Sequence, residues 1–217
     1  MRAVKPLSIP HGDFGGYIFD CDGTLADTMP LHHRAWTRLV AEYGGSFDEE
    51  TFYRLGGRPT ARILEQLRDQ QGLEISDVAA AVVRKEQYFL ELMHEVRPIE
   101  PVIEFARRWH SVRPLAVASG GMRRYVEMTL DAIGIKGLFD ALVCVEDCSR
   151  GKPNPDPFLE AARRLGVPAG ECLVFEDSRE GLDAAMRAGL RSVDVLAILP
   201  GPAADLRRDS QRGPDGT

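Results

Sequence analysis

The chain has 217 residues, of which 44% are hydrophobic and 28% charged, and its formal net charge is −6. This length and balance indicate a folded globular protein and exclude a disordered or collagen-like chain. No basic stripe interleaved with aromatic residues is present, and no apolar run is long enough to span a membrane. The four cysteines lack the density of a disulfide framework. We therefore expect a soluble, cytoplasmic monomer without a nucleic-acid or membrane partner.

Short apolar runs alternate with longer amphipathic stretches along most of the chain. Five such runs lack the polar–apolar alternation of half-exposed strands, which suits parallel strands that are covered on both faces. The predicted strands are 17–19, 114–118, 141–145, 172–175 and 192–196. Helical patterns, three of which stop at a glycine, cover 103–110, 126–134, 158–166 and 182–189. Repetition of this kind predicts an α/β fold with a doubly wound, Rossmann-like parallel sheet.

Residues 30–98 interrupt this rhythm, because the stretch is helical in pattern and contains no convincing strand. We predict that it forms a helical cap inserted after the first strand, with helices over 31–43, 60–71 and 76–94. Residues 14–29 and 99–199 would form a discontinuous α/β core, with hinges at 27–30 and 97–101. Proline and glycine interrupt the two ends of the chain, so we expect flexible termini over 1–13 and 200–217.

Polar residues follow several predicted strands at the edge where an open parallel sheet binds its ligands. They are Asp20, Ser119 and Glu176–Asp177 at strand ends, and Lys152 in the loop after the third strand. Parallel strands point the same way, so these side chains are expected to converge. Clustered carboxylates need a neutralising partner, and hard oxygen ligands suit Mg²⁺. A lysine, a serine hydroxyl and Gly120 near a helix N-terminus are suited to bind a phosphate.

Residues 20–27 read D-C-D-G-T-L-A-D, which resembles the nucleophile motif of the haloacid dehalogenase-like phosphohydrolases. The other three family motifs are matched in order by Ser119, by Lys152 in G-K-P-x-P and by Glu176–Asp177 in F-E-D-S-x-x-G. Within the first motif we interpret Thr24 as a residue that shapes the turn. The resemblance covers residues from about 14 to 197.

This resemblance implies phosphoryl transfer in two steps through an aspartyl-phosphate. Asp20 would attack phosphorus, and Asp22 would act first as general acid and then as general base. The implied Mg²⁺ ligands are the carboxylates of Asp20, Glu176 and Asp177 and the backbone carbonyl of Asp22. Ser119 and Lys152 would hold the transferring phosphoryl group.

The segment 27–36 is similar to one found in β-phosphoglucomutases and related sugar phosphatases, where its histidine, here His32, contacts the general acid. Arg84–Lys85 resembles the pair with which that branch reaches its substrate. The mutases also carry a cap arginine near Arg58 and Arg62, although the expected position itself is Thr60. The substrate-binding residues expected on these grounds are His32, Arg58, Arg62 and Lys85 in the cap and Gly120 in the core.

Three functions are compatible with the sequence, and one of them is favoured. Because cations for a second phosphate are missing at Thr60 and at Met122, we expect a Mg²⁺-dependent phosphatase of small sugar monophosphates. Residues 56–63 and 192–195 look more like those of bacterial fructose-1-phosphate phosphatases. The first alternative is a β-phosphoglucomutase that interconverts β-glucose 1-phosphate and glucose 6-phosphate, with Arg58 or Arg62 supplying the second phosphate site. The other is a non-catalytic phosphate-binding protein on the same scaffold, which the presence of Asp20 and Asp22 disfavours.

Overall fold

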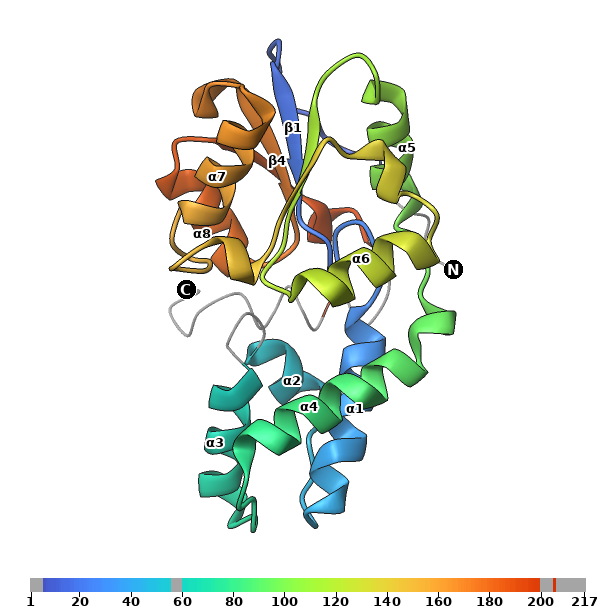
Figure 1. The fold of residues 1–217 in the computed structure, drawn as a ribbon, viewed down its shortest axis with the longest axis vertical. Coiled ribbons are helices and arrows are strands. Elements are labelled where there is room, and N and C mark those ends of the chain that lie inside the picture. Colours follow the sequence, from blue (N-terminus) through green and yellow to red (C-terminus); the bar gives the residue numbers. More distant parts are fainter. Residues whose placement is uncertain (1–5, 56–59, 200–204, 206–217) are drawn as a thin grey trace.

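The structure is a computed structural model that describes residues 6–55, 60–199 and 205. A parallel sheet lies between two layers of helices. A separate group of helices lies at one end of this unit, in the lower part of Figure 1. Among the described residues, no helix is long and apolar enough to cross a membrane. The predicted α/β fold with a parallel sheet is confirmed.

The sheet has five parallel strands in the order β3-β2-β1-β4-β5. The strands are β1 (Gly16–Phe19), β2 (Leu115–Ala118), β3 (Ala141–Val143), β4 (Cys172–Glu176) and β5 (Arg191–Asp194). Phe19 at the end of β1 pairs in register with Val117 of β2 and Phe175 of β4. The next residue along each strand therefore brings Asp20 level with Ala118 and Glu176. This register places the polar residues that follow these strands at one edge.

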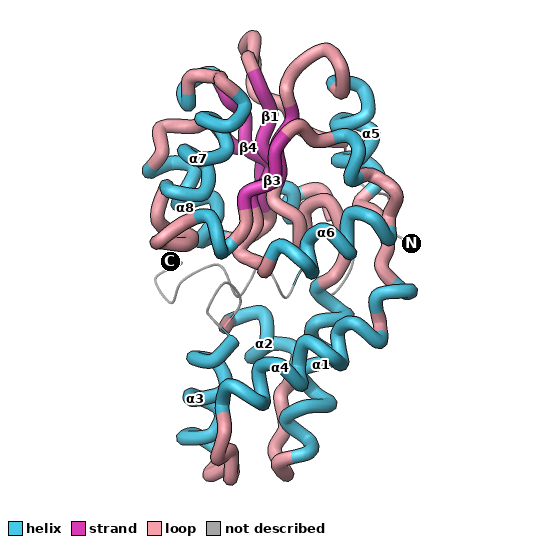
Figure 2. Tube along the Cα trace, in the orientation of Figure 1, coloured by secondary structure: helices cyan, strands magenta, loops and turns pink. Residues whose placement is uncertain are grey.

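Helices cover both faces of the sheet, which appears edge-on in magenta in Figure 2. They are α5 (Glu100–Trp109), α6 (Arg123–Ala132), α7 (Asp156–Leu165) and α8 (Arg179–Arg187). Tyr17 and Phe19 pack with the apolar residues of α5 and α6, whereas Ile18 packs with those of α7 and α8. Because both faces are buried, the strands are continuously apolar, as the sequence indicates. Helix α7 stops where Gly166 adopts a left-handed conformation (φ +68°).

Two of the predicted strands are too long at their carboxyl ends. The third ends at Val143, because the backbone N–H of Cys144 donates to Asp147 (2.7 Å) and a short 3-10 turn, η3 (Val145–Asp147), begins there. The fifth ends at Asp194, whose side chain accepts from the N–H of Ala197 (3.3 Å) and caps η5 (Val195–Ala197). The two remaining short turns in this unit are η2 (Lys136–Leu138) and η4 (Ala169–Glu171).

The helical group contains α1 (Met29–Glu42), α2 (Glu49–Arg54), α3 (Thr60–Gln71) and α4 (Val78–Glu91), followed by η1 (Met93–Glu95). It has a hydrophobic cluster of its own, to which all four helices contribute. Helix α2 was not predicted from the sequence. It is only six residues long, too short for a helical period, and Asp48 starts it by accepting from the N–H of Thr51 (2.8 Å).

The two connections between the helical group and the sheet run side by side. The N–H of Asp27 donates to the carbonyl of Arg97 (2.8 Å), and the N–H of Ile99 donates to the carbonyl of Leu25 (2.9 Å). Both lie in or beside the predicted hinges.

Near the start of the described residues, Arg191 donates to the carbonyl of His11 (2.6 Å). Most of the predicted flexible termini lie outside the described residues.

Candidate active site

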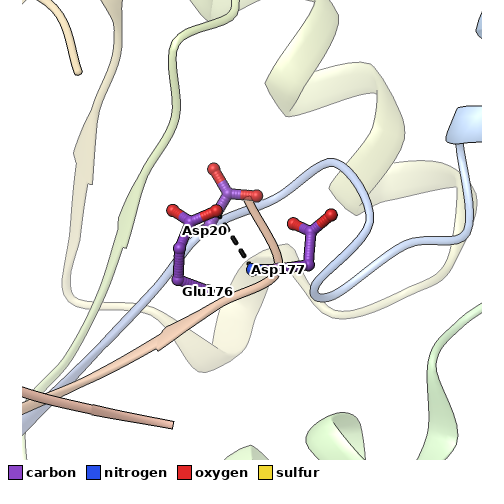
Figure 3. A group of neighbouring side chains, drawn as sticks. All are labelled: Asp20, Glu176 and Asp177. Carbon is purple, nitrogen blue, oxygen red and sulfur yellow. Dashed lines mark hydrogen bonds between the residues drawn. The ribbon is translucent and has the colours of Figure 1, made fainter. Parts of the chain in front are cut away.

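Three buried carboxylates meet at the carboxyl edge of the sheet. Asp20 follows β1, Glu176 ends β4, and Asp177 comes directly after it (Figure 3). Each offers an oxygen within 4.8 Å of the others. The backbone of Asp20 continues the strand pairing, since its N–H donates to the carbonyl of Phe175 (2.9 Å). The structure therefore brings together the three carboxylates expected to be metal ligands.

Lys152 lies against two of these carboxylates. Its ammonium donates to Asp20 Oδ1 (2.7 Å) and to Glu176 Oε2 (2.6 Å). Burial, and next the charge of Glu176, raise the pKa of Asp20, while Lys152 opposes them. Burial would lower the pKa of Lys152, but the two carboxylates outweigh it and raise that pKa. Lys152 is therefore held as an ammonium ion.

The charges and donors of this cluster fit a divalent cation. Three buried carboxylates and one partly buried ammonium leave a formal charge of −2. Carboxylates gathered in this way cannot all ionise without a neutralising partner. The donors offered are oxygens, which suit Mg²⁺ better than a softer metal. The expected backbone carbonyl of Asp22 belongs to the loop that directly follows Asp20.

Glu176 is locked in one orientation. Its Oε1 accepts from the N–H groups of Asp177 (3.1 Å) and Ser178 (2.9 Å) and from the hydroxyl of Ser178 (2.8 Å). The first of these bonds is the dashed line in Figure 3. The side chain passes directly over Gly181 in the first turn of α8, where a Cβ atom would lie 2.0 Å from Glu176 Cδ. Glycine at this position is what leaves room for the carboxylate.

Thr24 orients the third carboxylate. Its hydroxyl, wholly buried, donates to Asp177 Oδ1 (2.9 Å) across 153 positions of sequence. The sequence interpretation of Thr24 as a residue that only shapes the turn missed this contact. The sequence did offer a signal for it. Thr24 carries a hydroxyl four residues after Asp20, in a loop that lies close to the end of the neighbouring strand β4.

Asp22 is held from the side of the helical group. Its Oδ1 accepts from the hydroxyl of Thr28 (2.7 Å), and His32 Nε2 lies 3.7 Å from the same oxygen. Burial would raise the pKa of Asp22, but the interactions with His32 and Thr28 outweigh it and lower that pKa. Sequence reasoning placed Thr28 in a hinge and did not identify its bond to Asp22.

His32 is linked in turn to Lys85 of α4. The Lys85 ammonium lies 2.9 Å from His32 Nδ1. An ammonium group can only donate, so Nδ1 accepts, and the proton of the neutral imidazole is on Nε2, toward Asp22. Burial, followed by the charge of Lys85, lowers the pKa of His32, in keeping with a neutral ring. The ring also stacks on Phe89, with centroids 3.9 Å apart.

The remaining predicted cap residues are placed differently. Arg84 turns away from His32 and donates to Glu42 of α1 (2.7 Å), so only Lys85 of that pair reaches the histidine. Arg62 is 75% exposed and bonds Glu65 one turn further along α3 (2.9 Å). Arg58 lies outside the described residues.

The second predicted motif lies beside Asp22. Ser119 is buried, and its hydroxyl accepts from the N–H of Gly121 (3.0 Å). A Cβ atom on Gly121 would lie 3.3 Å from Ser119 Oγ and 3.8 Å from Asp22 Oδ2. At Gly120 a Cβ atom would meet nothing within 4 Å, so this glycine borders open space. All four motifs therefore meet at the same edge of the sheet.

Residues 14–189 match the haloacid dehalogenase-like hydrolase family. The chain belongs to this family. The match extends over the helical group and over every strand of the sheet except β5, and it contains all four motifs described above. The resemblance noted in the sequence is thereby confirmed.

Individual relatives agree with this assignment. The chain is 36% identical to the fructose-1-phosphate phosphatase YqaB of Escherichia coli over 85% of its own length and 98% of that protein. It is similar in structure to CbbY from Rhodobacter sphaeroides in complex with phosphate (TM-score 0.74, 28% identity, 82% and 84% of the two chains). The β-phosphoglucomutase of Clostridium difficile shares the fold (TM-score 0.72, 24% identity, 82% and 83% of the two chains). The predicted class of enzyme, a phosphoric monoester hydrolase, is confirmed.

Proposed function

We propose that this haloacid dehalogenase-like hydrolase is a Mg²⁺-dependent phosphatase of small sugar monophosphates that resemble fructose 1-phosphate. The observation that carries the proposal is the cluster of three buried carboxylates held by Lys152, next to an acid, Asp22, that faces the helical group. The identity to a fructose-1-phosphate phosphatase supports the class of substrate.

Each group has a role that its contacts support. Asp20 would attack phosphorus, and the ammonium of Lys152 beside it would stabilise the charge on the phosphoryl oxygens. When bound, Mg²⁺ would supply positive charge to the carboxylates and to the transferring group. Asp22 would give a proton to the departing sugar oxygen and later accept one from water. Thr28 and His32 would hold Asp22 in place for this transfer.

Residues 30–98 would act as a cap over this site, with residues 14–29 and 99–199 as the core. The pairing of Asp27 with Arg97 and of Leu25 with Ile99 supports hinges at these two crossings. His32 and Lys85 would then lie beside the departing sugar, close to the acid Asp22 that protonates it. Arg58 and Arg62 remain proposed contacts for the substrate, and Gly120 would approach the phosphate through its backbone.

The engagement of Arg123 favours a phosphatase over a mutase. Arg123 is the first cation after Ser119, so a mutase would be expected to use it for a second phosphate. Its guanidinium instead donates to the carboxylate of Asp147 and to the carbonyl of Leu142 (3.3 Å). It is therefore committed to joining α6 to the end of β3.

The proposal is tested by following phosphate release with Mg²⁺ from a panel of sugar monophosphates that includes fructose 1-phosphate and β-glucose 1-phosphate. A parallel coupled assay with a bisphosphate activator follows conversion of β-glucose 1-phosphate to glucose 6-phosphate. Steady release that a chelator stops and Mg²⁺ restores, and that Asp20→Asn abolishes without unfolding, is the expected result. Isomerisation without net release would overturn the proposal in favour of a mutase.

A further inference from the structure

Glu86 is a carboxylate next to the proposed sugar site that no sequence motif pointed to. It lies on α4 beside Lys85, and its Oε1 accepts from the Lys85 ammonium (3.1 Å). Its side chain is only 15% exposed. Phe89, one helical turn along, stacks on His32, so this face of α4 is turned toward the start of α1. Glu86 therefore belongs to the same cluster as the residues that hold Asp22.

The cluster is a continuous chain of polar contacts from α4 to Asp22. Glu86 bonds Lys85, Lys85 bonds His32 Nδ1 (2.9 Å), and His32 Nε2 lies 3.7 Å from Asp22. With His32 neutral, the positive charge of Lys85 is balanced by Glu86, and Asp22 leaves the cluster negative. In the absence of Glu86, Lys85 and Asp22 would balance each other, and the cluster would lose its net negative charge.

Most of the described arginines of the helical group already have carboxylate partners. Five arginines among its described residues are paired with carboxylates: Arg34, Arg38, Arg62, Arg68 and Arg84. A second phosphate that reached Glu86 would therefore meet a carboxylate whose charge these five paired arginines do not offset. Sugar hydroxyls, by contrast, can donate to a carboxylate and accept from an ammonium.

We propose that Glu86 is a specificity-determining residue that makes this site select sugars with one phosphate and reject sugar bisphosphates. This inference rests on the proposed function, because it assumes that the leaving group lies between Asp22 and α4. Glu86 works through charge: it repels a distal phosphate dianion and still offers an acceptor to a neutral polyol. Discrimination of this kind comes from an unfavourable contact with the wrong substrate.

The test compares kcat/KM for fructose 1-phosphate and fructose 1,6-bisphosphate in the full chain, or for another hydrolysed sugar phosphate and its bisphosphate. Glu86→Gln keeps the size and an acceptor for Lys85 but removes the charge. We expect it to raise the ratio of bisphosphate to monophosphate efficiency by about three- to tenfold, an effect that shrinks at high salt.

Two further variants separate charge from structure. Glu86→Asp keeps the charge and should keep the ratio of the unmodified enzyme. Glu74→Gln removes one charge from the exposed loop between α3 and α4, at the end of the helical group away from the sheet, and should also leave the ratio unchanged (Figure 1).

The inference is overturned if Glu86→Gln hydrolyses the monophosphate with an unchanged ratio, or if the Gln and Asp variants shift the ratio alike. A purely structural role would lower both efficiencies together and leave their ratio intact. Failure of the proposed function gives a different result, since the unmodified enzyme would then release no phosphate from either sugar.

Discussion

Gly181→Ala tests whether the geometry around Glu176 is as tight as the structure indicates. Gly181 lies in the first turn of α8, where alanine has the better helix propensity by about 1 kcal/mol. Local structure alone therefore predicts a small stabilisation. The tertiary structure predicts the opposite sign, because the new Cβ would lie 2.0 Å from both Cδ and Oε2 of Glu176.

The size of the effect follows from what holds Glu176. The side chain is 1% exposed, three bonds fix Oε1, and Lys152 holds Oε2. Overpacking of this kind costs about 1–3 kcal/mol, and losing one hydrogen bond to a charged group adds about 1.5–3 kcal/mol. After subtraction of the helix gain, we expect the free energy of unfolding to fall by about 1.5–5 kcal/mol. The midpoint of thermal unfolding should fall by at least about 3 °C.

Denaturant and thermal unfolding measure this change, and Gly170→Ala is the matched control. At Gly170 a Cβ atom would meet nothing within 4 Å, so that substitution should be close to neutral. In a Glu176→Ala background the clash is absent, and Gly181→Ala should become neutral or stabilising by up to about 1 kcal/mol. If Gly181→Ala is as stable as the parent, or costs the same in both backgrounds, the steric reasoning is wrong.

Two other predictions follow from single contacts. Thr24→Val removes the bond to Asp177 and should weaken Mg²⁺ binding about tenfold, as measured by calorimetry. Thr24→Ser keeps the hydroxyl and should bind Mg²⁺ nearly as the parent does. Equal affinities in the two variants would contradict the role given to Thr24. Hydrogen bonds from Arg163 and then Arg164 lower the pKa of Glu160 to about 2. Ionised Glu160 therefore stabilises the fold at pH values above its ordinary pKa of about 4.5. This contribution is lost as the pH falls toward 2. Glu160→Gln should therefore flatten the stability profile between about pH 4.5 and pH 2 relative to the parent, and an unchanged slope there would count against the reasoning.

Much of the fold was accessible from local signals. Continuous apolar runs identified all five strands, and glycine at 134, 166 and 189 marked helix ends correctly. Helix α3 was predicted at its observed bounds. Helix α2 was missed because six residues are too few to show a period. The strand ends near Cys144 and Asp194 were misplaced because side-chain caps, not hydrophobicity, terminate those strands.

The sequence by itself determined the class of fold, the helical insert and the residues of the four motifs, because each of these is written in neighbouring positions of the chain. Only the tertiary structure decided which partners those residues have. The bond from Thr24 to Asp177 spans 153 positions, and that from Lys85 to His32 spans 53. The commitment of Arg123 to Asp147 and the passage of Glu176 over Gly181 also depend on how α6 and α8 dock on the sheet. Such contacts depend on how separate elements pack together, and the spacing of residues along the chain does not predict this packing.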